Sequence, residues 1–335
     1  MRRDLASRKL PALWIALGAI IALALGGAAA AGPAAAQALI SADFGTNTSN
    51  VFSGREPRAE SLDPAFAAAN VWNQLAGEGP DPATDSPSWS SLMDSRGVST
   101  AVSFSVTGSV GFFDFGGTAP TDALFRDYMF FHHPAVPEKY SSDIDWRIAG
   151  LIPGAIYQMV LYGASADVGR TFNMLVDTDG DGDLSDEVNV PVITTGGFGT
   201  PTANQLGYLS SIRASAAGEI IGRGVGVTGN EADWAGFQLA YVDTDHDGVP
   251  DGVDACPNSD LSPTVVFDRC EINNVLFLTN GCTTADLIAE CAASAPNHSK
   301  FVKCVAKVTK QLTGVVGSSA VCKSHQGHEK ERFGR

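Results

Sequence analysis

Apolar positions between residues 100 and 242 either alternate with polar ones or fall into short runs. The pattern is clearest in the segments 100–108, 155–163, 170–177 and 234–242. A repeat of two residues is typical of β-strands with one buried face, and clusters of Gly, Pro, Asn and Asp between the segments indicate turns. Helical heptads are absent. The pattern predicts one β-sandwich domain over residues 37–242, in a chain that is mainly β.

The segment 54–90 departs from this pattern because it is rich in Pro, Ala and acidic residues. Such a composition favours long loops. The segment also contains Trp72 and Trp89, whose rings are suited either to anchor loops in the core or to form a platform for a ligand. Tyr140, in a later loop, is a third aromatic candidate for contact with a ligand.

Beyond Cys270 the spacing of apolar residues becomes helical. One face of segment 283–293 carries Leu287, Ile288 and Cys291, and one face of segment 297–312 carries Phe301, Cys304, Val305 and Val308. Each set recurs at intervals of three or four residues, as on one side of an α-helix. Thr283 or Thr284 is suited to cap the first helix, and Asn297 the second.

Two short helices make a domain too small to be stable without cross-links. All six cysteines lie in this last quarter of the chain: Cys256, Cys270, Cys282, Cys291, Cys304 and Cys322. An even number in an exported protein predicts three disulfides, with fifteen possible pairings. Zinc is the alternative, but no CxxC pair with matching spacing exists. We therefore expect a disulfide-linked helical cap over residues 271–322 and a flexible basic tail over 323–335.

The first 36 residues have the pattern of a secretory signal peptide. Arg2, Arg3, Arg8 and Lys9 precede an apolar stretch from Leu10 to Leu25, and small-residue cleavage patterns follow at 34–36 and 36–38. A membrane anchor is the alternative. No later stretch is long and apolar enough to span a bilayer, so no transmembrane helix is expected in the mature chain. The predicted location is secreted, extracellular or cell-surface, with the periplasm also open.

Charge narrows the classes of partner. The net charge is −15, while 44% of residues are hydrophobic, which favours a folded chain with a sizeable core over disorder. An acidic body repels nucleic acid and attracts cations. Basic residues gather after Asn297, where a solvated tail is the expected outcome.

Five aspartates crowd the segment 243–254, where like charges repel unless a cation neutralises them. They are Asp243, Asp245, Asp247, Asp251 and Asp254, at positions 1, 3, 5, 9 and 12 of a loop in which the Val249 carbonyl takes position 7. Gly248 falls at position 6, where such a loop turns sharply. This is the ligand spacing of an EF-hand loop with Asp in place of the final Glu, and Ca²⁺ is the cation that it suits. A solvated acidic linker is the alternative.

The stretch DTDHDGVPDGVDACPNSDLSPTVVFDRC, residues 243–270, resembles the thrombospondin type 3 repeat, whose pattern is DxDxDGxxDxxDxC. The resemblance implies a calcium-binding module between domains and a disulfide between Cys256 and Cys270. Only one clear repeat is present, so the resemblance does not imply a long calcium-filled array. The helical segment after it also resembles the Cys-containing cap of exported bacterial proteins.

A second acidic loop, DTDGDGDLSDE, spans residues 177–187. Asp177, Asp179 and Asp181 take positions 1, 3 and 5, and Gly182 takes position 6, but position 12 is Val188. Completion of a weaker calcium site would fall to Asp183, Asp186 or Glu187. The alternative is an acidic hairpin tip, which Asp-Gly pairs favour without any metal.

The β region resembles the jelly-roll, galactose-binding-like sandwich domains of exported bacterial surface proteins. The likeness rests on short motifs at 41–46, 72–75, 91–104, 146–163 and 234–242. It implies a fold but no particular ligand, because folds of this kind serve many functions.

Catalytic motifs are scarce. No GxSxG, phosphate-binding loop or HExxH sequence is present. His132 and His133, with Glu138 five residues on, form the most suggestive cluster, but adjacent residues of a strand point to opposite faces. Paired carboxylates that could hydrolyse glycosides cannot be singled out among so many acids.

The sequence therefore predicts an exported, calcium-binding surface or extracellular protein, non-enzymatic, with a sandwich that acts in adhesion or carbohydrate binding. The expected partner is a polysaccharide or cell-surface glycan. Two alternatives stay open: a secreted polysaccharide-degrading enzyme with the sandwich as catalytic domain, and a purely structural envelope protein. The sequence leaves the oligomeric state open.

Overall fold

The computed structural model describes residues 39–312, with gaps at 48–50, 54, 56, 69–70, 80–82, 116–123, 133–134, 136, 164–169, 195–205 and 268–269. The predicted signal peptide, the basic tail and Cys322 lie outside the described residues. Within them, every helix is too short or too polar to cross a membrane.

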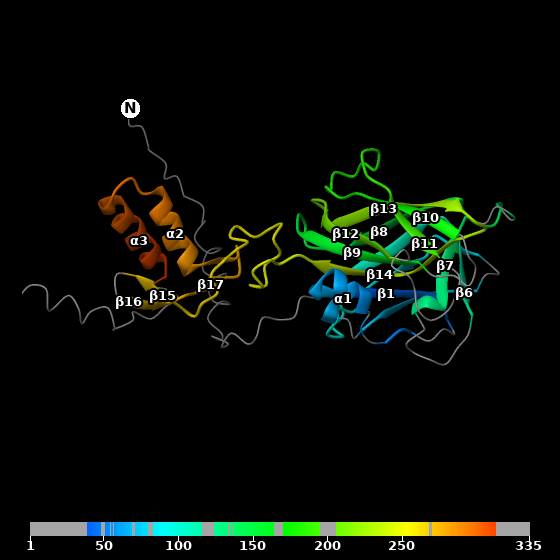
Figure 1. Ribbon diagram of the computed structural model, residues 1–335, viewed down its shortest axis with the longest axis horizontal. Coiled ribbons are helices and arrows are strands. Elements are labelled where there is room, and N and C mark those ends of the chain that lie inside the picture. Colours follow the sequence, from blue (N-terminus) through cyan, green and yellow to red (C-terminus); the bar gives the residue numbers. More distant parts are fainter. Residues whose placement is uncertain are drawn as a thin grey trace, which may run out of the picture. The chain divides into compact units, whose positions relative to one another are not determined.

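Fourteen strands build a β-sandwich (Figure 1). They are β1 (Leu39–Thr46), β2 (Asn73–Gly77), β3 (Thr84–Asp85), β4 (Ser88–Trp89), β5 (Ser103–Thr107), β6 (Ser109–Asp114), β7 (Asp127–Phe131), β8 (Asp143–Ala149), β9 (Ile156–Gly163), β10 (Arg170–Val176), β11 (Val190–Thr194), β12 (Leu206–Arg213), β13 (Glu219–Thr228) and β14 (Ala232–Tyr241). The four strands expected from the apolar pattern are β5, β9, β10 and β14. The prediction of a mainly β chain with a sandwich is confirmed.

The strands form two sheets. One has eight strands, in the order β12-β9-β14-β7-β6-β3, with β1 pairing β14 and β2. The other has six, in the order β11-β10-β13-β8-β5-β4. Strand β8 alternates buried and exposed residues because one face of the six-stranded sheet meets solvent. Strand β14 is buried along almost its whole length, because both faces of the eight-stranded sheet are covered around it.

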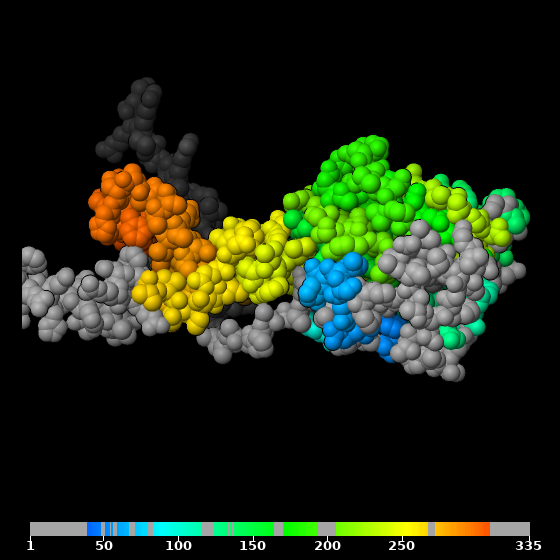
Figure 2. All heavy atoms as spheres, viewed as in Figure 1, coloured from blue at the N-terminus to red at the C-terminus, as the bar shows by residue number. Residues whose placement is uncertain are grey.

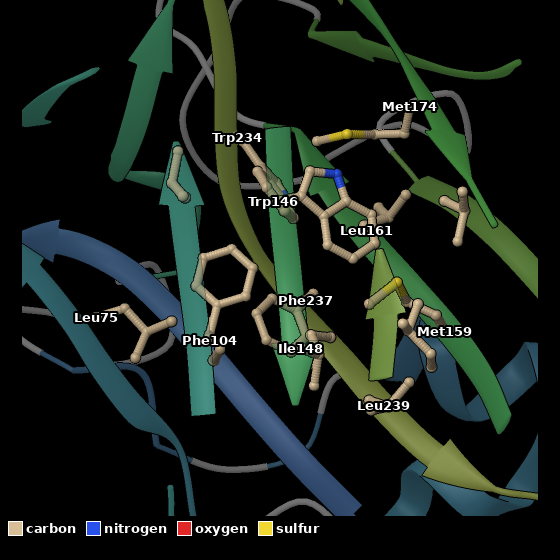
Figure 3. Packing of buried hydrophobic residues seen from close by; sticks show 14 of the residues in the cluster. Leu75, Phe104, Trp146, Ile148, Met159, Leu161, Met174, Trp234, Phe237 and Leu239 are labelled. Carbon is tan, nitrogen blue, oxygen red and sulfur yellow. The ribbon is translucent and has the colours of Figure 1, made fainter. Parts of the chain in front are cut away.

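The main core lies between the two sheets (Figure 3). Phe104 and Trp146 come from the six-stranded sheet, and Trp234 and Phe237 from the eight-stranded one. Their rings contact one another with centroids 5.1–6.4 Å apart. At Gly222 a Cβ would lie 2.3 Å from the Trp146 ring, so only glycine fits there.

A second apolar cluster covers the outer face of the eight-stranded sheet. The segment 54–90, expected to form long loops, contributes the short helices α1 (Pro57–Leu62) and η2 (Pro64–Ala68) as well as β2, β3 and β4. The expectation of loops alone was therefore wrong in part. Strand β2 pairs in parallel with β1, which is distant in sequence, and no local pattern reveals such a pairing. Phe66 and Trp72 from this segment are buried in the cluster.

The C-terminal part holds two short hairpins and two helices. They are β15 (Thr264–Phe267), β16 (Cys270–Asn273), β17 (Leu276–Phe277), β18 (Cys282–Thr283), α2 (Thr284–Ser294) and α3 (His298–Leu312). Thr283 caps α2 in a capping box with Asp286, and Asn297 accepts a hydrogen bond from Lys300 N at the start of α3. Both helices were expected within two residues of these bounds.

The two helices pack through a small apolar cluster. Its buried members are Cys291, Val305 and Val308, with Phe277, Leu287, Phe301 and Cys304 packed against them. These include the predicted inner face of α3, and Cys291 and Leu287 of α2. So few buried residues contribute little free energy of folding. The cross-links described next are therefore needed to stabilise this part of the chain.

Disulfides join Cys256 to Cys282 and Cys291 to Cys304. The expected Cys256–Cys270 pairing is therefore wrong. Residues 264–273 form a hairpin of their own, while Ala255 N donates a hydrogen bond to Asn280 O and draws the segment after the aspartate loop alongside residues 280–282. The Cα atoms of Cys256 and Cys282 are consequently only 5.0 Å apart, within bridging distance.

Candidate metal centre

The first aspartate loop begins two residues after β14, with the Asp243 side chain folded back over its own turn. The two carboxylate oxygens of Asp243 accept hydrogen bonds from Asp247 N (3.2 Å) and Gly248 N (3.0 Å). Gly248 has a φ of +92°, which glycine adopts without strain. The predicted sharp turn at position 6 is therefore present.

Three carboxylates meet inside this turn. Ligand oxygens of Asp243, Asp245 and Asp247 all lie within 4.8 Å of one another. Asp243 and Asp247 are each only 8% exposed. Burial raises the pKa of Asp243, and it raises the pKa of Asp247 to about 6, with a further contribution from Asp245 and Asp254. Three partly buried carboxylates this close together repel one another, so a cation bound between them would lower their energy.

Two oxygens of the loop lack a hydrogen bond. Asp247 Oδ2 and Asp254 Oδ2 are buried, and each accepts no hydrogen bond from any residue that the structure describes. Burial raises the pKa of Asp254, with smaller contributions from Asp245, Asp251 and Asp243, although Asp254 is not one of the three carboxylates that meet within 4.8 Å. A buried polar atom left without a partner costs about 1–3 kcal/mol, and more when it is charged. A bound cation would supply that partner.

Asp251 and Val249 have different surroundings. The Asp251 carboxylate accepts hydrogen bonds from Thr244 N (2.8 Å) and Thr244 Oγ1 (2.6 Å), and it is not part of the three-carboxylate group. At position 9 of such loops the ligand often acts through water, which agrees with this placement. Val249 is buried, and its N–H donates to Asp247 Oδ1 at 2.6 Å.

Residues far along the chain support the loop. Asp245 Oδ2 accepts a hydrogen bond from Ser259 N at 2.6 Å. Ser259 Oγ lies 2.7 Å from Asp286 Oδ2, 2.8 Å from Gly281 O and 3.0 Å from Cys256 O, so its hydroxyl donates to one of these three acceptors. In Figure 2 the atoms of this part of the chain (yellow) adjoin those of the helices (orange).

Sequence reasoning missed Ser259, Gly281 and Asp286 as neighbours of the site. The Thr-x-x-Asp spacing that ends at Asp286 is a capping-box signal, and it could have singled out Thr283 over Thr284 as the cap of α2. Nothing in that signal shows that the helix start lies beside the aspartate loop.

The second acidic loop follows β10 and gathers Asp177, Asp179 and Asp181 in the same way, with ligand oxygens within 4.8 Å. Asp177 is 2% exposed, and its two oxygens accept from Gly180 N (2.7 Å) and Gly182 N (2.9 Å). Asp179 and Asp181 are exposed, and each accepts a backbone hydrogen bond.

The candidates for closing this second loop point elsewhere. Glu187 accepts from Thr178 N and Thr178 Oγ1, and Asp183 accepts from Ser185 N at 2.8 Å. That backbone hydrogen bond lowers the pKa of Asp183. Val188, at position 12, is 79% exposed. The structure thus brings together the first three expected ligands of this loop and not Asp183 or Glu187.

The aromatic candidates for ligand contact lie in the core. Trp72 and Tyr140 are each 5% exposed, and Trp72 packs on Phe52 and Tyr162. Trp89 stacks on Phe104, and its indole N–H donates to Ala76 O. The role of ligand platform is therefore wrong for these residues, because their rings fill gaps beside the sheets.

The histidine cluster is not assembled as a metal site within the described residues. His132 packs its ring against Gly226, where a Cβ would lie 2.0 Å from His132 Cγ. Glu138 is exposed, and His133 lies outside the described residues. In the part of the chain that the structure describes, the only groups of three potential metal ligands are the two aspartate triads.

Asp43 is a buried residue whose carboxyl group lies outside both loops. Asp43 in β1 is 1% exposed; its Oδ2 accepts from Phe52 N at 2.7 Å, whereas Oδ1 has no partner among the described residues. Burial, with a smaller contribution from Asp114, raises the pKa of Asp43 to about 8. A proton on Asp43 at neutral pH relieves the cost of burying its charge.

The chain matches no protein-family model and no curated protein. Among solved structures it is similar to TmCBM61, solved in complex with beta-1,4-galactotriose, at 16% identity over 41% of this chain and 86% of that one, with a TM-score of 0.25. A family 35 carbohydrate binding module from Clostridium thermocellum matches at 9% identity, over 39% and 90% of the two chains, with a TM-score of 0.24. An exo-beta-1,3-galactanase from Phanerochaete chrysosporium matches at 13% identity, over 47% and 30%, with a TM-score of 0.26. Scores this low carry no argument about a ligand for this chain.

Proposed function

We propose that this chain is an exported calcium-binding protein in which the loop 243–254, a thrombospondin type 3-like repeat, holds one Ca²⁺ after the β-sandwich. The observation that carries the proposal is the buried Oδ2 of Asp247, which has no hydrogen-bond partner among the described residues and belongs to a triad of converging carboxylates. Asp243, Asp245, Asp247 and Asp254 would hold the ion, with the Val249 carbonyl as a further ligand.

The donor set favours calcium over other metals. All the candidate donors are oxygens, which suit hard cations and not zinc or copper. Ca²⁺ accepts six to eight oxygens at flexible angles, whereas Mg²⁺ requires a compact octahedron and keeps several of its waters. A twelve-residue loop whose last acid is distant in sequence suits the flexible coordination of Ca²⁺ better than the compact octahedron of Mg²⁺.

Calorimetric titration of calcium into chelator-treated protein tests the proposal. We expect one site, loss of binding in Asp247→Ala, and a melting temperature of the parent that rises with calcium, since an ion bound only to the folded form stabilises it by mass action. Asp260→Ala is the matched control, because Asp260 is an exposed carboxyl of the same region that bonds only its own turn. Equal binding by the parent and by Asp247→Ala would refute the ligand assignment, and no binding by the parent would refute the function.

The role of the sandwich in adhesion or carbohydrate binding remains a prediction, as do the enzymatic and purely structural alternatives. The surface best suited to a glycan is the outer face of the six-stranded sheet, which is open to solvent. It displays the ion pairs Arg147–Glu219 and Arg223–Asp145. A panel of neutral and acidic polysaccharides, tested for binding and for turnover, separates these roles, and Arg223→Ala should weaken binding if this face is used.

A further inference from the structure

The aspartate loop is closed from outside by a segment of the C-terminal part. A Cβ built on Gly281 would lie 2.0 Å from Asp254 Oδ1, so the position-12 carboxylate rests directly on the Gly281 backbone. Gly281 has a φ of +72° and leads straight into Cys282. The same oxygen, Asp254 Oδ1, accepts a hydrogen bond from Cys256 N at 2.7 Å. The last carboxylate of the loop therefore lies between the two residues that the disulfide joins.

Further contacts fix this segment over the loop. Ala255 N donates to Asn280 O at 3.0 Å, and Gly281 N donates to Phe277 O at 2.9 Å. Ser259, whose N–H holds Asp245, has its hydroxyl 2.8 Å from Gly281 O. Two loop carboxylates, Asp245 and Asp254, thus take their positions from residues 256–282, and the covalent link between those residues is the Cys256–Cys282 disulfide.

We propose that calcium binding in the loop 243–254 and the Cys256–Cys282 disulfide stabilise each other. The inference rests on the proposed function and extends it, since it makes the disulfide a positioning element of the ion site. With the disulfide intact, Asp254 is held where it reaches the ion. With the ion bound, Asp254 holds Gly281 and the Cys256 N–H in place, so that the two sulfur atoms stay together.

Thermodynamic linkage makes the two effects equal. If the disulfide raises calcium affinity by some factor, calcium must favour the disulfide over the two thiols by the same factor. Couplings of this kind are typically 5–150-fold, and a tenfold effect is a reasonable expectation for one carboxylate held at both ends. The second disulfide, Cys291–Cys304, joins α2 to α3 within the apolar cluster of these helices, so it provides an internal control.

Reduction by dithiothreitol measures one side of the linkage. A thiolate of the reagent attacks one sulfur of Cys256–Cys282, and its second thiol closes onto the mixed disulfide. The protein S–S bond breaks, an S–S bond forms in the reagent, and two electrons and two protons pass to the cysteines. The protein is equilibrated at graded ratios of reduced to oxidised dithiothreitol, in calcium and in chelator with matched ionic strength, and alkylation with peptide mass spectrometry gives the reduced fraction of each disulfide.

We expect calcium to raise about tenfold the ratio of reduced to oxidised dithiothreitol at which half of Cys256–Cys282 is reduced, and to leave that ratio for Cys291–Cys304 within twofold. Equal ratios for Cys256–Cys282 with and without calcium would overturn the linkage. The reciprocal measurement is calorimetric: the double variant Cys256→Ser, Cys282→Ser should bind calcium about tenfold more weakly, while Cys291→Ser, Cys304→Ser should bind it like the parent.

Gly281→Ala keeps both cysteines and every carboxylate, so it tests the contact even if the serine variants fold poorly. The added methyl group would push Asp254 away, and we expect at least a tenfold loss of calcium affinity. Gly97→Ala is the matched control, because Gly97 has nearly the same φ (+75°), while the nearest atom to its Cβ would be 4.0 Å away. Equal affinities of Gly281→Ala and the parent would contradict the proposal.

The two proposals fail differently. A parent protein that binds no calcium refutes the function and the linkage together. A parent that binds calcium, but whose Cys256–Cys282 reduction and calcium affinity are independent of each other, refutes the linkage alone.

Discussion

The two aspartate loops begin alike and end differently. Each follows a buried strand with a buried aspartate, Asp243 or Asp177, that accepts a hydrogen bond from the glycine at position 6. That glycine has a φ of +92° in one loop and +89° in the other. In both, the threonine at position 2 binds a later carboxylate. The DxDxDG spacing therefore gives the same turn in both loops.

The difference lies in burial and in the last acid. In the first loop Asp247 is buried and Asp254 closes the site, and each has an oxygen without a hydrogen bond from the described residues. In the second loop Asp179 and Asp181 are exposed, and position 12 is the exposed Val188. A motif of aspartates thus shapes the backbone, whereas enclosure of the carboxylates creates the need for a cation.

Among the variants that test the difference between the two loops, Asp254→Asn should cause the largest loss of calcium affinity. The amide keeps the shape of the side chain and can still accept the hydrogen bond from Cys256 N, but it removes one negative charge from the ion site. Since affinity follows the number of charged ligands, we expect a loss of about a hundredfold in calorimetric titration. An affinity within threefold of the parent would show that Asp254 is not a ligand.

Asp43 is a buried carboxyl outside both loops, so it shows what burial does to a carboxyl that has no neighbouring aspartate loop. Its pKa is raised from 3.8 to about 8, so the folded form binds the proton more tightly than the unfolded chain. The stability that this provides is fully present below pH 4 and is lost as the pH rises through about 8. Chemical unfolding of Asp43→Asn from pH 4 to 9 should lack this loss, which for a pKa raised from 3.8 to about 8 is on the order of 6 kcal/mol. Glu138→Gln, at an exposed carboxyl, should keep the parent profile.

Val188→Asp would give the second loop the acid that it lacks. Because Val188 is 79% exposed, the substitution removes no core contact. We expect the affinity of this loop for calcium to rise about tenfold, measured in an Asp247→Ala background that silences the first loop. If affinity does not change, the exposure of Asp179 and Asp181, and not the missing acid, limits the second loop.

Thr244→Val should have the smallest effect. The hydroxyl donates to Asp251 Oδ2 at 2.6 Å, while the backbone N–H of the same residue continues to hold Oδ1. Loss of one solvent-exposed hydrogen bond is worth about 0.5–1 kcal/mol, so calcium affinity should fall about threefold. Thr178→Val, at the same position of the second loop, is the control and should leave the first site unchanged.

Much of the architecture could be predicted from local patterns. Alternation marks strands such as β10 because the pleat repeats every two residues, and three-to-four spacing marks the buried side of α3. The convergence of Asp243, Asp245 and Asp247 followed from sequence because the turn that gathers them is made by consecutive residues. Thr283 and Asn297 were recognisable as caps for the same reason.

Long-range contacts could not be predicted. The parallel pairing of β1 with β2 depends on the fold as a whole, and so does the burial of Trp72. The Cys256–Cys282 disulfide depends on the hydrogen bond between Ala255 and Asn280, which no spacing of cysteines reveals. The enclosure of Asp254 by Gly281 is of the same kind, because it joins residues that are distant in sequence.

The small apolar cluster of the helices has a consequence for where the chain can mature. With three buried members, Cys291, Val305 and Val308, it has little to keep it folded before sulfur bonds form. In a reducing compartment this end of a newly made chain would therefore stay open. It would close where an oxidant allows Cys256–Cys282 and Cys291–Cys304 to form.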